Sequence, residues 1–166
     1  RNILFIGRLE KEKGIFETIK TFKLIKNKNI TLNIIGYGVK EIENKIFNLI
    51  KKDKRIFFHG KLYGEEKENI IKKTDLFIFP SYYPEGQPVT ITEIVLNNIP
   101  IITTDVGNNK EIYGDNLIYV KKQNIDDLKN KIEWIINNIE NYKYNYSEAL
   151  KKIDINNITN QFLNLK

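Results

Sequence analysis

The sequence predicts an α/β fold, a doubly wound parallel sheet of about six strands with helices on both faces. Two observations lead to this prediction. Short apolar runs, typical of buried strands, alternate along the chain with longer stretches whose apolar residues recur at helical spacing. The short runs are apolar throughout instead of alternating with polar residues, as is typical of parallel strands covered on both faces. In such folds, ligands bind beyond the carboxyl ends of the strands.

The predicted strands end at residues that break an extended run. The first strand ends at Gly7, the second at a Gly-Tyr-Gly turn, and the fourth at Pro80. The six predicted strands span residues 2–6, 31–35, 55–58, 75–79, 100–103 and 116–120.

The predicted helices lie between and after these strands. Pro88 suits the first turn of a helix, and Asn98 suits its end because Asn tolerates the left-handed conformation. The helices span residues 14–26, 42–50, 65–73, 88–96 and 125–139, and a polar, Asn- and Lys-rich helix closes the chain.

Composition and length restrict the class of protein. The chain has 166 residues, which fits one domain, with 41% hydrophobic and 29% charged residues, typical of a soluble globular protein. The absence of Cys excludes disulfide and thiolate chemistry, and a single histidine, His59, excludes a multi-histidine metal site. No apolar run has the roughly 18–20 residues that span a bilayer. Because Met is also absent, we expect a domain taken from a longer protein.

The formal net charge of +6 raises the question of a nucleic-acid partner. The chain holds 24 Lys and only three Arg, and it is also rich in Ile and Asn, residues with AT-rich codons. The lysines are spread along the sequence instead of forming blocks. The charge therefore indicates solvation of the surface, and a nucleic-acid partner is not expected.

The loop after the fourth strand carries two carboxylates, Glu85 and Glu93, eight residues apart. Backbone N–H groups of residues 86–90 would lie at a helix N-terminus, where they can bind an anion. A carboxylate beside an anion site suits the hydroxyls of a sugar or ribose. The alternative, that both are ordinary surface charges, stays open on spacing alone.

Other loops at the same edge hold further candidates. Arg8 and Lys13 flank the turn after the first strand, and together they suit a diphosphate, although a solvated turn is the alternative. Gly107 predicts a positive-φ turn before Glu111. Gly36 begins a turn after the second strand that lacks the full dinucleotide-binding glycine pattern. His59 closes the third strand, where a structural role is favoured over a ligand contact.

Several enzyme classes are excluded by missing motifs. The sequence has no GxxxxGK[ST] phosphate loop and no GxSxG elbow, and one His makes a Ser-His-Asp triad improbable.

Taken together, the loops resemble the C-terminal, donor-binding domain of a GT-B glycosyltransferase of the retaining family 4 type. The most specific motif is E-x7-E, here Glu85 to Glu93. The other matching segments are PSYYPEGQP at residues 80–88, GRL…KG at residues 7–14, and TTDVG…E at residues 103–111. Asn108 departs from the family pattern, which has a second Gly there, and this leaves the donor sugar open.

The resemblance implies a Rossmann-like half of a GT-B enzyme over residues 1–166, with the N-terminal acceptor domain absent. Arg8 and Lys13 would stabilise the leaving diphosphate, Glu85 would contact the transferred sugar, and Glu93 the ribose. The other positions implied in donor binding are Gly86, Gln87, Pro88, Val89, Thr90, Gly36 and His59.

The implied reaction is sugar transfer from a UDP- or GDP-linked donor to a polysaccharide or glycolipid acceptor, with retention and without a metal or other cofactor. Carboxylate ligands for a metal stay open. The resemblance implies a cytoplasmic location, with membrane contact through the parent protein, and little activity of the isolated domain. Two alternatives are a non-catalytic nucleotide- or sugar-binding module and an NAD-type dinucleotide-binding domain.

Overall fold

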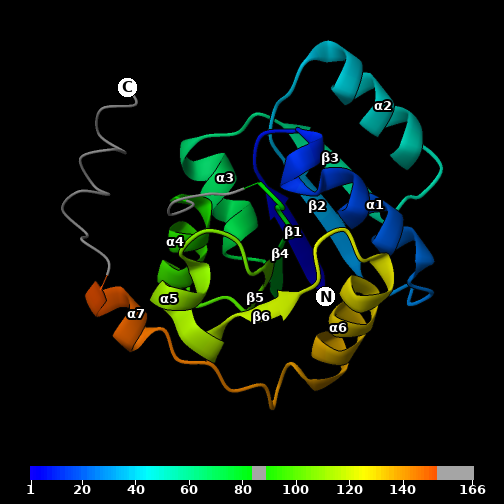
Figure 1. Cartoon of the computed structure of the whole chain (residues 1–166). Helices are drawn as coiled ribbons and strands as arrows, with labels where there is room; N and C mark the ends of the chain where they lie inside the picture. Colours follow the sequence, from blue (N-terminus) through cyan, green and yellow to red (C-terminus); the bar gives the residue numbers. More distant parts are fainter. Residues whose placement is uncertain (84–88, 153–166) are drawn as a thin grey trace.

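The computed structural model describes residues 1–83 and 89–152 (Figure 1). Within them, one parallel sheet has the strand order β3-β2-β1-β4-β5-β6, which confirms the predicted fold class. The strands are β1 (Asn2–Ile6), β2 (Thr31–Ile35), β3 (Ile56–Gly60), β4 (Leu76–Phe79), β5 (Ile101–Thr104) and β6 (Ile118–Val120).

Helices cover both faces of the sheet. Helices α1, α2 and α6 lie on one side, and α3, α4 and α5 on the other (Figure 1). Every helix within the described residues is too short or too polar to span a lipid bilayer. The helices are α1 (Ile15–Leu24), α2 (Lys40–Ile50), α3 (Gly64–Ile71), α4 (Val89–Leu96), α5 (Asn109–Tyr113), α6 (Ile125–Asn138) and α7 (Ser147–Lys152).

The structure differs from the sequence prediction mainly in short elements. Two 3-10 helices, Lys11–Lys13 and Gly114–Asn116, and the five-residue α5 were not predicted, because they are too short to show a helical period. Helix α7 begins the predicted final helix, and residues 153–166 lie outside the described residues. The predicted left-handed Asn98 and the positive-φ turn at Gly107 are confirmed, with φ of 52° and 60°.

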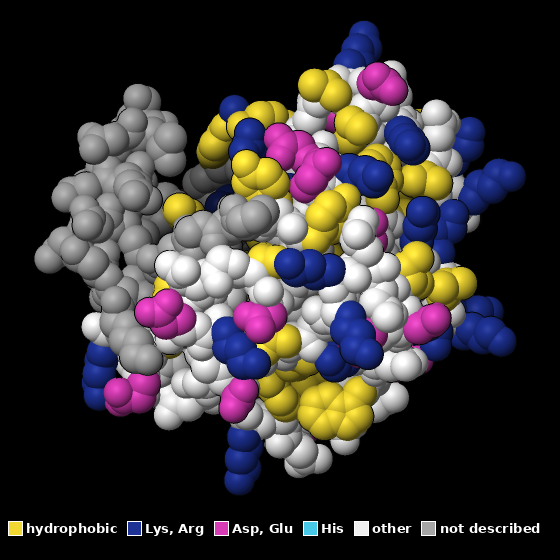
Figure 2. Space-filling view, viewed as in Figure 1, with side chains coloured by type: hydrophobic (Ala, Val, Ile, Leu, Met, Phe, Trp, Pro, Cys, Tyr) yellow, Lys and Arg dark blue, Asp and Glu magenta, His cyan; other side chains and the backbone are white. Residues whose placement is uncertain are grey.

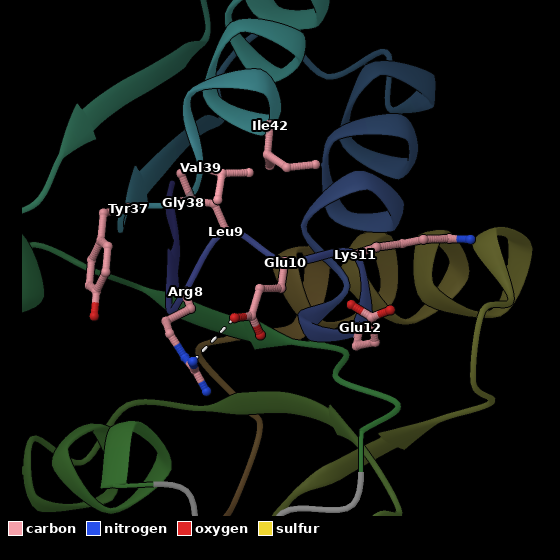
Figure 3. Close-up of a pocket in the computed structure, with 9 residues that line it drawn as sticks. All are labelled: Arg8, Leu9, Glu10, Lys11, Glu12, Tyr37, Gly38, Val39 and Ile42. Atoms are coloured by element: carbon pink, nitrogen blue, oxygen red, sulfur yellow. Dashed lines mark ion pairs between the residues drawn. The ribbon is translucent and has the colours of Figure 1, made fainter.

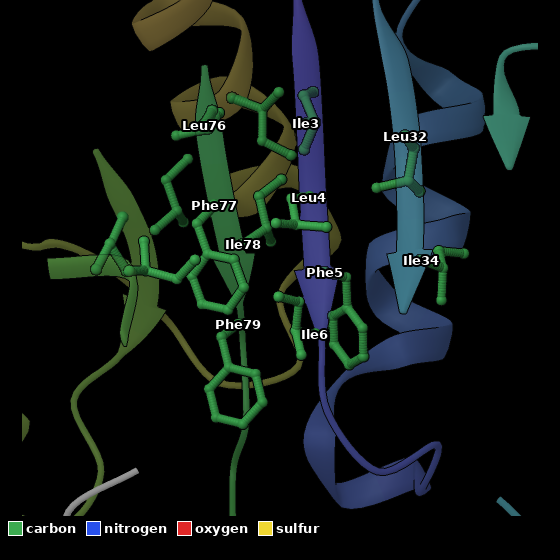
Figure 4. Close-up of a cluster of buried hydrophobic side chains, with 14 of the residues drawn as sticks. Ile3, Leu4, Phe5, Ile6, Leu32, Ile34, Leu76, Phe77, Ile78 and Phe79 are labelled. Carbon is green, nitrogen blue, oxygen red and sulfur yellow. The ribbon is translucent and has the colours of Figure 1, made fainter. Parts of the chain in front are cut away.

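The core lies between the central strands and the helices on both faces (Figure 4). Strands β1 and β4 are buried almost throughout, since neighbouring strands flank them and helices cover them. Phe79 of β4 packs against Phe5 and Phe77, with ring centroids 6.0 and 6.2 Å away. Burial of whole aromatic side chains makes this region a major source of stability.

The strand order creates a switch point between β1 and β4. From there the chain proceeds outward to β2 and β3 on one side and to β5 and β6 on the other. The loops after β1 and β4 therefore diverge at the carboxyl edge, the position where doubly wound folds bind ligands. The sheet topology thus selects these two loops as the frame of a site.

The two loops are in direct contact. The Tyr82 backbone N–H donates to the Glu12 carbonyl over 2.9 Å, and the Ser81 hydroxyl donates to the same oxygen over 3.2 Å. Gly14 has a φ of 78°, and a Cβ there would lie 2.5 Å from the Pro80 carbonyl oxygen. A residue with a side chain would therefore be strained at position 14 and would push the loops apart.

We expect Gly14→Ala to destabilise the fold by about 3 kcal/mol, because it combines left-handed strain with a clash against rigid backbone. Gly60→Ala is the matched control: Gly60 has a φ of 69°, but the space around its added Cβ is open. It should lose only about 1 kcal/mol, the cost of the left-handed conformation. Urea unfolding measures both losses. Equal losses would show that the Gly14–Pro80 contact does not constrain the loops.

Candidate functional site

A cavity of about 200 Å³ lies at the carboxyl ends of β1 and β2. Three cationic side chains border it, Arg8 from the loop after β1, Lys61 from the loop after β3, and Lys67 from α3. The full lining is Ile6, Gly7, Arg8, Ile35, Gly36, Tyr37, Lys61, Leu62, Tyr63 and Lys67. The cavity combines positive charge with aromatic walls, a combination that suits an anionic ligand carrying a flat ring.

Gly36 allows the loops that form this cavity to approach closely. The Gly7 N–H donates to the Ile35 carbonyl over 3.1 Å, and the Gly36 N–H donates to the Gly60 carbonyl over 2.8 Å. A Cβ on Gly36 would lie 2.0 Å from the Gly7 carbonyl oxygen. Glycine is therefore required at position 36 by packing, and the cavity wall there is backbone.

A second cavity, of about 470 Å³, adjoins the first on the side of α2 (Figure 3). Arg8 and Tyr37 border both cavities. The Arg8 Nη1 lies 3.2 Å from the Glu10 Oε1, and the two side chains point toward each other in Figure 3. Because 60% of the Arg8 side chain is exposed, this ion pair is weak and can be exchanged for a ligand.

Lys13, the second predicted diphosphate residue, lies differently from Arg8. It is only 7% exposed, and its Nζ lies 5.3 Å from the centre of the Tyr83 ring. The Lys13 ammonium is thus held where the loops after β1 and β4 meet. The structure places it beside the switch point and not among the residues that line either cavity.

Glu93 lies in the second turn of α4 and faces α3. Its Oε2 accepts a hydrogen bond from the Lys67 Nζ at 2.7 Å, and both side chains are about four-fifths buried, with 21% and 20% exposed. Because Lys67 also borders the smaller cavity, the ion pair fixes the Glu93 carboxylate next to it. One carboxylate oxygen thus has a strong, charged partner within the fold.

His59 is not brought together with Arg8 or Glu93. Its Nε2 lies 2.8 Å from the Asn33 Oδ1, on a face of the sheet, and His59 borders neither cavity described above. Partial desolvation lowers the pKa of His59 below its ordinary value and so favours the neutral ring.

Of the remaining predicted residues, the structure describes Val89 and Thr90. Val89 and Thr90 are the first residues of α4 that the structure describes, and both are partly exposed. Glu85, Gly86, Gln87 and Pro88 lie outside the described residues. Within residues 1–83 and 89–152, no group of three or more His, Cys, Asp or Glu side chains is arranged to hold a metal ion.

Two cationic residues of the smaller cavity, Lys61 and Lys67, were not identified from the sequence. Lys67 lies in a run of charged residues that is typical of a solvated helix face. Nothing near it in the sequence therefore indicates that it pairs with Glu93 of α4. Lys61 has its Nζ 4.7 Å from the Tyr37 ring centre and 4.9 Å from the Tyr63 ring centre. Only the fold brings the loops after β2 and β3 together around this ammonium.

Comparison with known proteins gives a family match over nearly the whole chain. The family model described as "Glycosyl transferases group 1" matches residues 1–152. The capsular polysaccharide biosynthesis glycosyltransferase CapM of Staphylococcus aureus is 26% identical over 139 residues, 80% of this chain and 36% of CapM. The putative teichuronic acid biosynthesis glycosyltransferase TuaC of Bacillus subtilis is 28% identical over 114 residues, 69% of this chain and 27% of TuaC. The chain thus spans about a third of these relatives.

A solved structure shows the same fold. The Anabaena protein HepE, crystallised with UDP and glucose, superposes with a TM-score of 0.81 and 19% identity, over 99% of this chain and 47% of HepE. The chain therefore has the architecture of one half of a GT-B glycosyltransferase, as the sequence motifs indicated. The retaining family 4 subtype stays a prediction.

We expect a double-mutant cycle of Lys67→Met and Glu93→Gln to give a coupling free energy of about 1–2 kcal/mol, because the pair is largely buried and charged. The control cycle uses Glu68 of α3 and Lys72, the residue that follows α3; their charged groups are 3.6 Å apart and both side chains are mostly exposed. That pair should couple by about 0.3 kcal/mol. Chemical unfolding of the single and double variants measures both values. Similar coupling in the two cycles would mean that Lys67 does not hold Glu93.

Proposed function

Since the chain belongs to the group 1 glycosyl transferases, we propose that it forms the donor-binding half of an enzyme that transfers a sugar from a nucleotide-diphosphate-sugar. The acceptor is a polysaccharide or glycolipid, and the anomeric configuration is retained. The names of CapM and TuaC, which refer to polysaccharide synthesis, support this class of acceptor.

The observation that carries the proposal is the position of Arg8. It follows the central strand β1, borders both cavities at the carboxyl edge, and among residues 1–83 and 89–152 its guanidinium pairs with the exposed Glu10. Surface pairs of this kind contribute about 0–1 kcal/mol, so a diphosphate can replace the Glu10 carboxylate at little cost. A guanidinium can bind two phosphate oxygens at once.

The donor would then extend across the switch point. In this proposal the nucleobase occupies the smaller cavity beside Gly36 and Tyr37. The ribose hydroxyls would donate to the carboxylate of Glu93, which pairs with Lys67. The diphosphate lies toward Arg8 and the first turn of α4, where Val89 and Thr90 stand. The HepE structure, which contains UDP and glucose on the same fold, supports this class of ligand.

The catalytic contribution of this half is electrostatic. Departure of the nucleoside diphosphate concentrates negative charge on the leaving phosphate, and fixed positive groups lower the barrier to that step. Arg8 supplies one such group at the cavities, and Lys13 supplies another where the two loops meet. We propose that these side chains do the work of a metal cation, so that no metal cofactor is needed, and that Glu85 contacts the transferred sugar.

The whole reaction requires more than these residues provide. Because the chain spans about a third of CapM and TuaC, we propose that residues 1–166 are the donor domain and that the acceptor binds to another part of the parent protein. The isolated chain should then bind nucleotide but show little transferase activity. The parent enzyme would act in the cytoplasm or at the inner face of the membrane.

Isothermal titration with UDP, GDP, ADP, their sugar conjugates and NAD tests the proposal. We expect binding of UDP or GDP and no binding of NAD. Arg8→Gln and Glu93→Gln should each weaken binding of the preferred nucleotide about tenfold, the loss of one charge-assisted contact.

Lys72→Gln is the matched control, since it removes an exposed charge just after α3 that borders neither cavity. It should leave the dissociation constant within about twofold, as expected of a screened surface charge. Preferential binding of NAD would favour a dinucleotide-binding domain. Nucleotide binding that both site variants leave unchanged would place the ligand elsewhere.

A further inference from the structure

The positive charge of the chain is concentrated in one part of the fold. Residues 20–61 hold eleven Lys and Arg against three Asp and Glu, a formal charge of +8, and the rest of the chain totals −2. Within this segment the lysines alternate with the apolar residues of α1, α2 and β3 and do not form one continuous run. In three dimensions these elements are neighbours, and Figure 2 shows Lys and Arg side chains projecting from the right-hand edge, where α1 and α2 lie.

Specific contacts hold this basic region together. The Arg55 Nη1 donates to the carbonyls of Ile25 and Asn27, each over 2.8 Å, and thereby ties the start of β3 to the end of α1. The Lys23 Nζ donates to the Leu49 carbonyl over 3.0 Å, which ties α1 to the end of α2. The region is therefore a fixed surface and not a set of independent loops.

Two large apolar side chains are exposed within the same region. Phe47 of α2 is 61% exposed and Phe57 of the edge strand β3 is 46% exposed. Both border a shallow depression of about 640 Å³, and Lys51 and Lys54 border it with them. Exposed aromatic rings flanked by lysines are the pattern of a surface that contacts the membrane interface.

Asp53, the acidic residue that borders the depression, does not neutralise the neighbouring lysines. Asp53 accepts two hydrogen bonds from Arg55, over 2.9 Å to Nε and 2.7 Å to Nη2. These bonds lower the pKa of Asp53, so it stays ionised and paired. Lys51, Lys52 and Lys54, in contrast, are exposed, and Lys51 makes a surface hydrogen bond from its Nζ to the Asn48 Oδ1 over 3.2 Å.

We propose that this surface, formed by Phe47, Lys51, Lys52, Lys54 and Phe57 and called here the α2–β3 edge, binds the surface of an anionic lipid bilayer. The two phenylalanine rings enter the interface, and the three lysines lie among the lipid phosphates. Each lysine near a negatively charged bilayer is expected to strengthen binding roughly fivefold. The edge shares no residue with the two donor cavities, so lipid and nucleotide can bind together.

The chemistry favours lipid over the two other partners that fit a basic apolar surface. Nucleic-acid recognition relies strongly on Arg, but the only Arg of this region, Arg55, is engaged with Asp53 and backbone carbonyls. A second copy of the chain could pair with the open edge of β3, but two surfaces of high positive charge repel each other. An anionic bilayer can contact both groups, because it accepts the apolar rings in its interface and pairs the lysines with its phosphates.

Co-sedimentation with vesicles tests the proposal. The chain should bind vesicles of phosphatidylcholine with about one third phosphatidylglycerol, lose this binding at about 1 M salt, and not bind pure phosphatidylcholine. The triple variant Lys51→Gln/Lys52→Gln/Lys54→Gln should bind about a hundredfold more weakly, the product of three lysines.

Matched controls separate position from net charge. The triple variant Lys72→Gln/Lys110→Gln/Lys143→Gln removes the same charge from exposed lysines elsewhere and should bind within about threefold of the original chain. Phe47→Ser should weaken binding, whereas Trp134→Ser, which removes an aromatic residue that is also half-exposed, should not. Circular dichroism confirms that each variant is folded.

Several results would overturn the proposal. They are equal losses in the two triple variants, equal binding to neutral vesicles, or no sedimentation with either vesicle. Tighter binding to a 30-base-pair DNA than to the anionic vesicles would assign the surface to nucleic acid, and dimers seen by light scattering that Phe57→Ser dissolves would assign it to self-association. Nucleotide titration of the same variants is independent of lipid, so failure here leaves the donor site untouched.

Discussion

The contact between the loop after β1 and the end of β4 is the constraint on which the rest of the site depends. Gly14 lies against the Pro80 carbonyl, and both Tyr82 and Ser81 donate to the Glu12 carbonyl. These contacts hold the switch point in one geometry, and the segment that leads toward α4 must start from it. Doubly wound folds bind ligands between the loops at this switch point, so the spacing of the loops after β1 and β4 must be fixed.

Backbone packing brings the loops together, and three cationic side chains then line the place where they meet. Glycine at position 36 allows the loops to approach closely. Arg8 pairs with the loop carboxylate of Glu10, and Lys67 pairs with Glu93 on the neighbouring helix α4. Lys61 instead lies against the rings of Tyr37 and Tyr63. Of the two carboxylates, Glu10 is the more exposed, and it is the one that a diphosphate can replace. The backbone of the site is therefore fixed before a ligand binds, and the Arg8 guanidinium is the group that can change its partner.

Much of this architecture could be predicted from the sequence, and the reasons are physical. Continuous apolar runs such as Leu4–Phe5 identify buried parallel strands, and Asn98 identifies a helix end, because burial and backbone conformation act on single residues and their near neighbours. The ion pair of Lys67 and Glu93 and the position of His59 could not be predicted, since each depends on a residue about 26 positions away that only the fold brings close. The excess of positive charge in residues 20–61 is visible in the sequence itself, but its assembly into one surface depends on the fold. Glu85, the residue with the most specific motif, lies outside the described residues.

The central claim is that a nucleotide binds at the carboxyl edge, across the switch point between β1 and β4. The most direct measurement is a titration of the ¹⁵N-labelled chain with UDP and GDP, followed residue by residue in amide NMR spectra. The account predicts that the largest shifts fall on Gly7, Arg8, Gly36, Tyr37 and Thr90, while Asn33 and His59 on the sheet face change little. Saturable shifts centred on the sheet face or on the α2–β3 edge, with the carboxyl-edge amides unmoved, would contradict it.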